Sequence, residues 1–234
     1  MKKKKKILCT ICARGNSKGL KNKNIRKING KPLISLTINH AIKSNLFDNI
    51  VVSTENNKIL KVSKKYGVKD LIKRPKNLSS DKSPKIPVIR HCLTEMEKKL
   101  NKKFDIIVDL DVTAPLRKVD DIKKAFKQFN SQNSSTLFSA CISRRNPYFN
   151  AVEFKNKKIK PIKNLMKKIP GRQFAPKVYD MNASIYIWNR KTLLNSNTVF
   201  QNNTSVYLMP EERSIDIDNK FDFKVVSFLL KNEK

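Results

Sequence analysis

Short apolar runs alternate along the first 145 residues with segments whose apolar positions recur at helical spacing. The apolar runs predict buried strands, and the periodic segments predict helices between them. The predicted strands are 6–13, 49–55, 104–111 and 135–143, and the predicted helices are 32–45, 57–67, about 86–100 and 120–129. This alternation is typical of an α/β fold, a mostly parallel, doubly wound sheet covered by helices.

The pattern changes after residue 145. Residues 148–154 and 158–162 predict a short antiparallel excursion, and 163–182 predict a long irregular segment. Irregular segments of that length inside a compact domain are usually functional or make an oligomer contact. A strand at 183–190, and a strand followed by a terminal helix at 214–231, complete one domain, 1–234.

The charge of the chain is strongly positive, with a formal net charge of +32. Such a charge suggests a basic nucleic-acid-binding module as one class of function. However, only ten of the 51 basic residues are arginine, and the lysines are spread along the whole chain. Nucleic-acid readers place arginines and aromatic residues on one face, so this class remains an alternative and not the first hypothesis.

The first residues resemble a secretory leader, but the apolar part is short and polar, and it meets Arg14 without a cleavage-like site. Together with the absence of a long apolar run, this predicts a cytoplasmic protein. Cys9 and Cys12 form a CxxC, while Cys92 and Cys141 are isolated in the sequence. We interpret all four as buried, reduced thiols and not as metal or redox ligands.

A basic loop, ICARGNSKGLKNKN at 11–24, follows the first predicted strand. The first strand-to-helix loop of an α/β sheet usually holds phosphate. Here no P-loop or GxGxxG is present, so Arg14, Lys18 and Lys23 would supply charge while Gly15 and Gly19 let backbone amides approach. The alternative is a solvated basic turn.

Two carboxylates in SIDIDN, Asp216 and Asp218, are two positions apart in a predicted strand and therefore share one face. Mg²⁺ is commonly held by one or two carboxylates together with substrate phosphates, so the pair is a candidate magnesium site. The alternative is an exposed acidic edge strand.

Two further polar segments follow predicted strands. LDVTAPLR at 110–117 presents Thr113 and Arg117, and RPKNLSSD at 74–81 presents Arg74 and a serine pair before Asp81. The first is also compatible with a plain strand-to-helix turn. The second could contact a base and ribose, or could cap the next helix.

Taken together, six ordered motifs resemble those of the CMP-sialic acid synthetase family, the acylneuraminate cytidylyltransferases. The motifs are ARGNSKGLKNKN, VVSTE, RP…LSSD, LDVTAPLR, MNASIYIW and SIDIDNKFD, and they run from about residue 7 to 228. The resemblance implies a Rossmann-like nucleotidyltransferase fold and a homodimer. It also implies that residues 145–182 form a dimerisation excursion that closes over the partner's acceptor site.

The resemblance implies Mg²⁺-dependent transfer of CMP from CTP to the anomeric hydroxyl of a nonulosonic acid. Arg14, Lys23 and Asp216 would be catalytic, and Asp216 and Asp218 would bind the metal. The residues implied around CTP are Arg14, Ser17, Lys18, Lys23, Asn24, Arg74, Ser80 and Asp81.

On the acceptor side the chain departs from the sialic acid pattern, with Asp111 in place of the usual Gln and Ala114 in place of Ser. An ionised Asp accepts hydrogen bonds but donates none, so it suits an acceptor with different donors. In this respect the chain is more similar to members acting on legionaminic acid or related bacterial nonulosonates. The implied acceptor residues are Asp111, Thr113, Arg172, Lys177 and Asn182. Surface salt bridging is the alternative for Arg172 and Lys177, and 3-deoxy-manno-octulosonate is the alternative acceptor.

Overall fold

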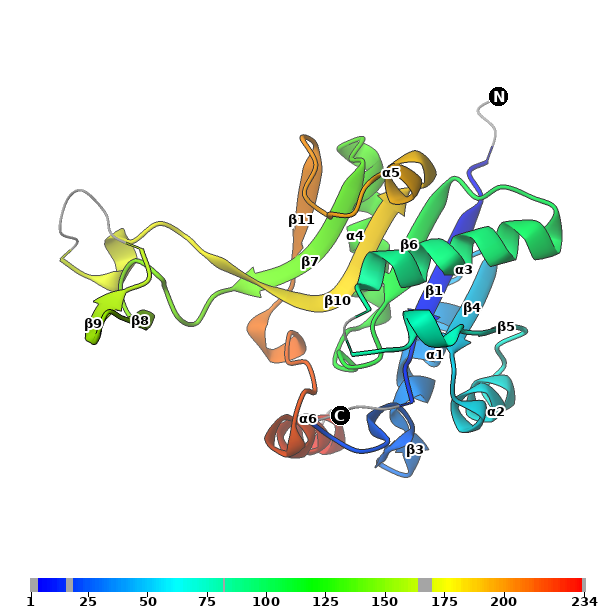
Figure 1. The fold of residues 1–234 in the computed structure, drawn as a ribbon, viewed down its shortest axis with the longest axis horizontal. Helices are drawn as coiled ribbons and strands as arrows, with labels where there is room; N and C mark the ends of the chain where they lie inside the picture. Colours follow the sequence, from blue (N-terminus) through cyan, green and yellow to red (C-terminus); the bar gives the residue numbers. More distant parts are fainter. Residues whose placement is uncertain (1–3, 16–18, 82, 164–169, 233–234) are drawn as a thin grey trace.

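A seven-stranded sheet forms the centre of the molecule (Figure 1). The computed structural model describes residues 4–15, 19–81, 83–163 and 170–232. The strand order is β11-β7-β10-β6-β1-β4-β5. The strands are β1 (Ile7–Cys12), β4 (Asn49–Thr54), β5 (Asp70–Lys73), β6 (Ile106–Leu110), β7 (Thr136–Ile142), β10 (Tyr179–Asn189) and β11 (Thr204–Leu208).

The predicted mostly parallel sheet is confirmed: β1, β4, β5 and β6 run parallel, and β11 runs parallel to β7. β10 is the exception, since it lies antiparallel between β6 and β7. The hydrophobic pattern of the sequence did not predict β5 or β11. These are the two edge strands, short and only partly buried, so they lack the continuous apolar run of the central strands.

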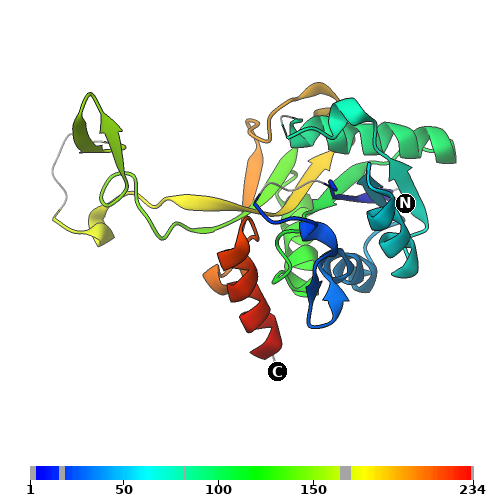
Figure 2. The ribbon, with the colours of Figure 1, turned by 60° about the horizontal axis from the view of Figure 1, so that its bottom comes forward.

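Helices cover both faces of the sheet (Figures 1 and 2). Successive side chains of β1 point to opposite faces, so Cys9 packs in the core beneath α1, α2, α4 and α6, while Leu8 packs in the core beneath α3 and α5. The helices are α1 (Leu33–Ser44), α2 (Asn57–Lys65), α3 (Lys85–Leu100), α4 (Val119–Ser131), α5 (Arg190–Asn195) and α6 (Lys220–Asn232). None of these helices is long and apolar enough to cross a membrane, within the residues that the structure describes.

A small hairpin follows the basic loop. Its strands, β2 (Lys27–Ile28) and β3 (Lys31–Pro32), pair antiparallel around Asn29 and Gly30. Both turn residues have positive φ, 48° and 76°, which is the conformation that an Asn-Gly hairpin turn requires.

A long arm projects from the sheet between β7 and β10 (Figures 1 and 2). Its tip carries an antiparallel hairpin, β8 (Val152–Lys155) and β9 (Lys158–Pro161), as the sequence predicted. The arm closes where Ser143 N donates to Val178 O at 2.9 Å. The predicted irregular segment therefore ends too late, because 179–182 already belong to β10 and pair with β7.

His40 on α1 provides a test of acid stability. Its Nδ1 is buried and has no hydrogen-bond partner in the described structure. Burial and the nearby cations Arg117 and Lys43 lower its pKa from 6.5 to about 3, against an opposing effect of Asp121. Below pH 6.5 the unfolded chain therefore binds a proton at His40 that the folded chain does not, and folding loses stability as the pH falls.

We expect the free energy of unfolding to fall by about 2 kcal/mol between pH 6.5 and 5 through this group, at up to about 1.4 kcal/mol per pH unit. Urea unfolding of His40→Gln at the two pH values should lack that loss. His91→Gln is the matched control, because the pKa of His91 is raised through its hydrogen bond with Cys92. An equal acid loss in His40→Gln and wild type would contradict the assignment.

Candidate functional site

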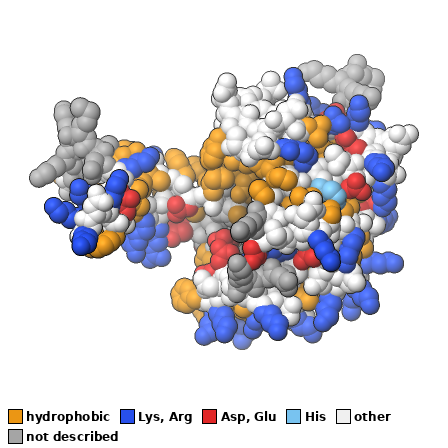
Figure 3. Space-filling view, viewed as in Figure 1, with side chains coloured by type: hydrophobic (Ala, Val, Ile, Leu, Met, Phe, Trp, Pro, Cys, Tyr) orange, Lys and Arg blue, Asp and Glu red, His pale blue; other side chains and the backbone are white. Residues whose placement is uncertain are grey.

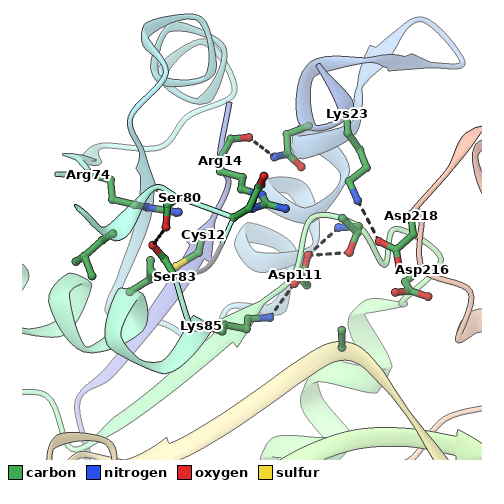
Figure 4. A pocket seen from close by; sticks show the side chains of 16 residues that line it. Cys12, Arg14, Lys23, Arg74, Ser80, Ser83, Lys85, Asp111, Asp216 and Asp218 are labelled. Atoms are coloured by element: carbon green, nitrogen blue, oxygen red, sulfur yellow. Dashed lines mark hydrogen bonds and ion pairs between the residues drawn. The ribbon is translucent and has the colours of Figure 1, made fainter. Parts of the chain in front are cut away.

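A cavity of about 370 Å³ opens at the carboxyl ends of β1 and β6 (Figure 4). From β1 the chain moves outward to β4 and β5, and then returns to the other side of β1 as β6. Ligands of open α/β sheets bind at such a switch in strand order. The cavity collects residues from four predicted motifs: the basic loop, RPKNLSSD, LDVTAPLR and SIDIDN.

The start of the basic loop is held by side chains beneath it. Glu55 Oε1 accepts a hydrogen bond from Gly15 N at 2.5 Å, and Asn24 Nδ2 donates to the Arg14 carbonyl at 2.8 Å. A Cβ on Gly15 would collide with Asn56, so glycine is needed there for close packing. Asn24 is buried and supports the loop through the backbone. Ser17 and Lys18, predicted CTP contacts, lie outside the described residues.

Arg14 reaches across the cavity mouth, where its Nη1 lies 2.5 Å from Asp81 Oδ1. Both side chains are more than a third exposed, so this pair contributes at most about 1 kcal/mol. A triphosphate carries far more negative charge than one carboxylate, so Arg14 can exchange Asp81 for phosphate oxygens at little cost.

Lys23 connects the basic loop to the acidic segment. Its Nζ donates to Ile217 O at 2.6 Å and lies 3.3 Å from Asp218 Oδ1, although the residues are 195 positions apart in sequence (Figure 4). On the other side, Ile217 N donates to Thr113 O at 2.8 Å. A Cβ on Gly19 would collide with the Asp218 carbonyl, so the two loops are in direct backbone contact.

Asp216 and Asp218 both line the cavity, on either side of the buried Ile217. The strand predicted here is absent, since 214–218 form a loop that pairs with no strand of the described chain. Both carboxylates nevertheless line the same cavity, so they do share one side as predicted. Burial raises the pKa of Asp216, and Asp218 raises it further.

This repulsion between carboxylates favours a cation beside them. Among the described residues no group of three or more His, Cys, Asp or Glu side chains could hold a metal. Two carboxylates fit the mode of binding in which substrate phosphates and water supply the remaining Mg²⁺ ligands.

The opposite end of the cavity is formed by Arg74 and the segment before α3. The Arg74 guanidinium is buried and donates to Ser53 Oγ and Ser53 O at 3.1 and 2.6 Å. Ser80 Oγ lies 2.8 Å from Ser83 Oγ, and both serines line the cavity. This end offers a ligand less positive charge than the Arg14 end, because the Arg74 guanidinium is already engaged by Ser53. It therefore suits an uncharged base or ribose.

One wall of the cavity carries an unforeseen thiol pair. Cys12 lines the cavity, and its Sγ lies 3.9 Å from that of Cys92 on α3. The position of Cys92 in the sequence suggested an isolated thiol, but the fold places it beside Cys12. The four cysteines are free, as predicted. Helix α3 packs against β1, and this contact brings the two thiols together.

The floor of the cavity contains Asp111, Thr113 and a lysine that the sequence analysis missed. Asp111 Oδ1 accepts from Thr113 N and Oγ1 at 3.0 and 2.9 Å, and Lys85 Nζ lies 2.7 Å from Asp111 Oδ2. Lys85 Nζ also lies 3.0 Å from Asp109 Oδ2, a fully buried carboxylate. The VDLD pattern could have predicted such a cation, because two carboxylates on a buried strand require a positive charge nearby.

Three predicted acceptor residues do not line this cavity. Asn182 is buried, and its amide accepts from Ser139 Oγ and donates to Ser214 Oγ, so its contact with the acceptor stays a prediction. Arg172 and Lys177 belong to the arm and are exposed. Arg172 donates to Ser143 O at 3.2 Å. In a single chain, both cations are remote from the predicted CTP residues.

Comparison with known proteins gives consistent matches. A cytidylyltransferase family model matches residues 8–225. The chain is 48% identical over 224 residues to CMP-N,N'-diacetyllegionaminic acid synthase of Campylobacter jejuni, covering 96% of this chain and 94% of that protein. It is 32% identical to the pseudaminic acid cytidylyltransferase of the same species, covering 97% of each chain.

Among solved structures, CMP:2-keto-3-deoxy-manno-octonic acid synthetase complexed with CTP matches with a TM-score of 0.70. The alignment covers 98% of this chain and 100% of that one at 16% identity. A 4-diphosphocytidyl-2C-methyl-D-erythritol synthase gives a TM-score of 0.68 at 14% identity, covering 97% of this chain and 99% of that one. At these identities the likeness concerns the fold, and it supports the Rossmann-like nucleotidyltransferase architecture.

Proposed function

Because the chain belongs to the cytidylyltransferase family, we propose that it transfers CMP from CTP to the anomeric hydroxyl of a nonulosonic acid. The proposed acceptor is of the legionaminic acid type, and the product is a CMP-activated sugar for glycan biosynthesis. The observation that carries the proposal is the contact between a basic loop and an acidic segment at one end of a cavity that collects residues from four of the predicted motifs. The 48% identity to a legionaminic acid synthase supports the acceptor class.

In the proposed reaction the acceptor hydroxyl attacks the α-phosphorus of CTP, and the bond to the β-phosphate breaks to release pyrophosphate. Such transfers need stabilisation of charge on the phosphoryl oxygens more than covalent help. Arg14 and Lys23 supply that charge from the basic loop. Mg²⁺ on Asp216 and Asp218 would neutralise phosphate oxygens and polarise the reacting groups.

The hydroxyl must also lose its proton. Among the described residues that line the cavity there is no histidine. Burial raises the pKa of Asp216, with a further contribution from Asp218, and a carboxylate with a raised pKa is the better proton acceptor. We therefore assign proton acceptance to the Asp216 carboxylate in the state in which Asp216 itself binds no cation.

The test is pyrophosphate release from CTP and Mg²⁺ with N-acetylneuraminic, legionaminic, pseudaminic and 3-deoxy-manno-octulosonic acids as separate acceptors. We expect release to be fastest with a legionaminic acid derivative. Faster release with 3-deoxy-manno-octulosonate would show that this sugar, the alternative acceptor, is the substrate. No release with any acceptor, from a folded sample, would contradict the proposed function.

A nucleic-acid-binding module is the alternative from another class. Figure 3 shows Lys and Arg side chains scattered over the visible face of both body and arm instead of in one stripe. Binding to a polyanion that weakens steeply with salt, in a sample that releases no pyrophosphate, would favour this alternative.

A CTP-dependent reaction places the proposed enzyme in the cytoplasm, where the nucleotide is available.

A homodimer is the proposed state of the chain. Every residue of β8 and β9 is exposed, and the hairpin displays Phe154 and Ile159 at 74% and 69% exposure. An isolated two-stranded hairpin is at best marginally stable, and exposed apolar groups of this size mark an interaction site. A second copy is the proposed partner, and its cavity would receive Arg172 or Lys177 from the arm.

Sedimentation equilibrium should give twice the chain mass of 27.0 kDa for the wild type. Replacing Phe154 and Ile159 together by Asp should shift the mass toward that of one chain, because charge is placed in the apolar contact. Lys157→Asp, in the turn between β8 and β9, is the control. A wild type of single-chain mass would exclude the homodimer.

A further inference from the structure

A buried charge cluster lies at the floor of the cavity, centred on Lys85. This residue begins α3, and its ammonium lies 2.7 Å from Asp111 Oδ2 and 3.0 Å from Asp109 Oδ2. It also lies 4.5 Å from the centre of the Tyr186 ring on β10. Asp109 is anchored from β1, since its Oδ1 accepts from Thr10 Oγ1 at 2.7 Å. Three strands of the sheet, β1, β6 and β10, thus fix one lysine.

Lys85 and Asp111 hold each other in their charged forms. Burial works against the ammonium, but Asp109 and Asp111 outweigh it and raise the pKa of Lys85 well above its ordinary value. Burial likewise opposes ionisation of Asp111, but Lys85 and the hydrogen bonds of Thr113 lower its pKa to about 2. One cation and two carboxylates leave this part of the cavity slightly negative.

The cluster retains a small hydrogen-bonding capacity toward the cavity. Asp111 Oδ1 already accepts two hydrogen bonds from Thr113, while among the described residues Oδ2 accepts only from Lys85. A carboxylate oxygen can accept two hydrogen bonds, and an ammonium has three N–H groups. Asp111 Oδ2 therefore keeps one acceptor position, and Lys85, which forms one described hydrogen bond and an ion pair with Asp109, keeps donor capacity beside it. The Lys85 side chain is 31% exposed, and that of Asp111 is 21% exposed.

We propose that Lys85 is a specificity-determining residue that reads a hydroxyl group of the acceptor sugar together with Asp111. This inference rests on the proposed function. A hydroxyl donates one hydrogen bond and accepts others, so it can donate to Asp111 and accept from Lys85 at the same time. A carboxylate or phosphate in this position would be repelled by Asp109 and Asp111. The acceptor's carboxylate and the CTP phosphates therefore belong at the Arg14 and Lys23 end.

The pair also accounts for Asp at position 111. A free Asp beside the buried Asp109 would suffer like-charge repulsion, and Lys85 removes it. A neutral amide at 111 would leave Lys85 with one carboxylate and a different donor pattern. We therefore expect Lys85 and Asp111 to determine acceptor choice as a unit.

The test is steady-state kinetics of Lys85→Met, Asp111→Asn and the double variant, with both substrates varied. Loss of one hydrogen bond to a charged group should raise the acceptor KM of Lys85→Met about tenfold or more, since such bonds contribute about 1.5–3 kcal/mol. The CTP KM should stay within about twofold, because neither Lys85 nor Asp111 is among the residues assigned to CTP. The double variant should lose less than the sum of the single losses, as contacting residues do.

Two comparisons separate a role in recognition from a merely structural one. Lys99→Met is the matched control, because Lys99 is also on α3 and pairs with Asp70 at 2.8 Å, outside the cavity. Deoxy analogues of the acceptor give the second comparison. Removal of the recognised hydroxyl should weaken binding to the wild type. It should not weaken binding to Lys85→Met any further.

If Lys85→Met does not fold, Lys85→Arg keeps the charge between the carboxylates but displaces the donor, and it should still raise the acceptor KM. An unchanged acceptor KM in a folded Lys85 variant, or an equal rise in both KM values, would overturn the inference while leaving the proposed function intact. Wild-type protein that releases no pyrophosphate with any acceptor would overturn both.

Discussion

Asp218→Ala is expected to lower kcat about 10²- to 10³-fold while the protein stays folded. The Asp218 side chain is 74% exposed, so its removal costs little packing. What is lost is one of two carboxylates at the proposed Mg²⁺ site and the acidic partner of Lys23. Loss of one group that stabilises transition-state charge typically costs a factor of this size.

The measurement is the rate of pyrophosphate release as a function of Mg²⁺ concentration. Asp120→Ala is the control, since Asp120 is similarly exposed and pairs only with Lys124 on the surface of α4 among the interactions described. The control should keep the wild-type rate and Mg²⁺ requirement. A near wild-type rate for Asp218→Ala at low Mg²⁺ would remove the metal assignment.

Arg117→Ala is expected to lower the free energy of unfolding by about 3–5 kcal/mol, the usual cost of breaking a buried charged network. Arg117 is 1% exposed and donates to three parts of the chain. Its Nη1 bonds Ser184 O at 2.7 Å, and its Nη2 bonds Thr37 Oγ1 and Asp111 O at 3.1 and 3.2 Å. The alanine variant removes all of these Arg117 hydrogen bonds, although Ser184 O and Asp111 O keep one donor each from Asp111 N and Thr37 Oγ1, and it leaves a cavity in place of the guanidinium.

Urea unfolding monitored by circular dichroism measures this loss. Arg26→Ala is the control, because Arg26 is exposed and the one interaction described for its side chain is with the Phe223 ring at 5.0 Å, worth about 0.5–1 kcal/mol. A loss for Arg117→Ala no larger than that for Arg26→Ala would show that the buried guanidinium is not a structural link. Such a result would contradict the idea that Arg117 holds the Asp111 turn in position.

The sequence by itself determined the elements that have strong local signals. Long apolar runs such as 6–13 and 104–111 are buried strands wherever they pair, and periodic segments such as 120–129 expose one polar face as helices. The basic loop and the two carboxylates of SIDIDN were also predictable, because charge and spacing of two residues are local properties. Strand order at the switch between β1 and β6 then brought them to one cavity.

Tertiary structure alone decided which distant groups meet. Lys23 contacts Asp218 across 195 positions. Lys85 contacts Asp109 of β6 and Asp111 just beyond its end, because the helix after a polar segment packs against the sheet at that point. Asn182 was predicted to face the acceptor, but the antiparallel insertion of β10 between β6 and β7 turns its amide toward Ser139 and Ser214. Local patterns record whether a residue is buried, while strand order and helix packing decide its partners.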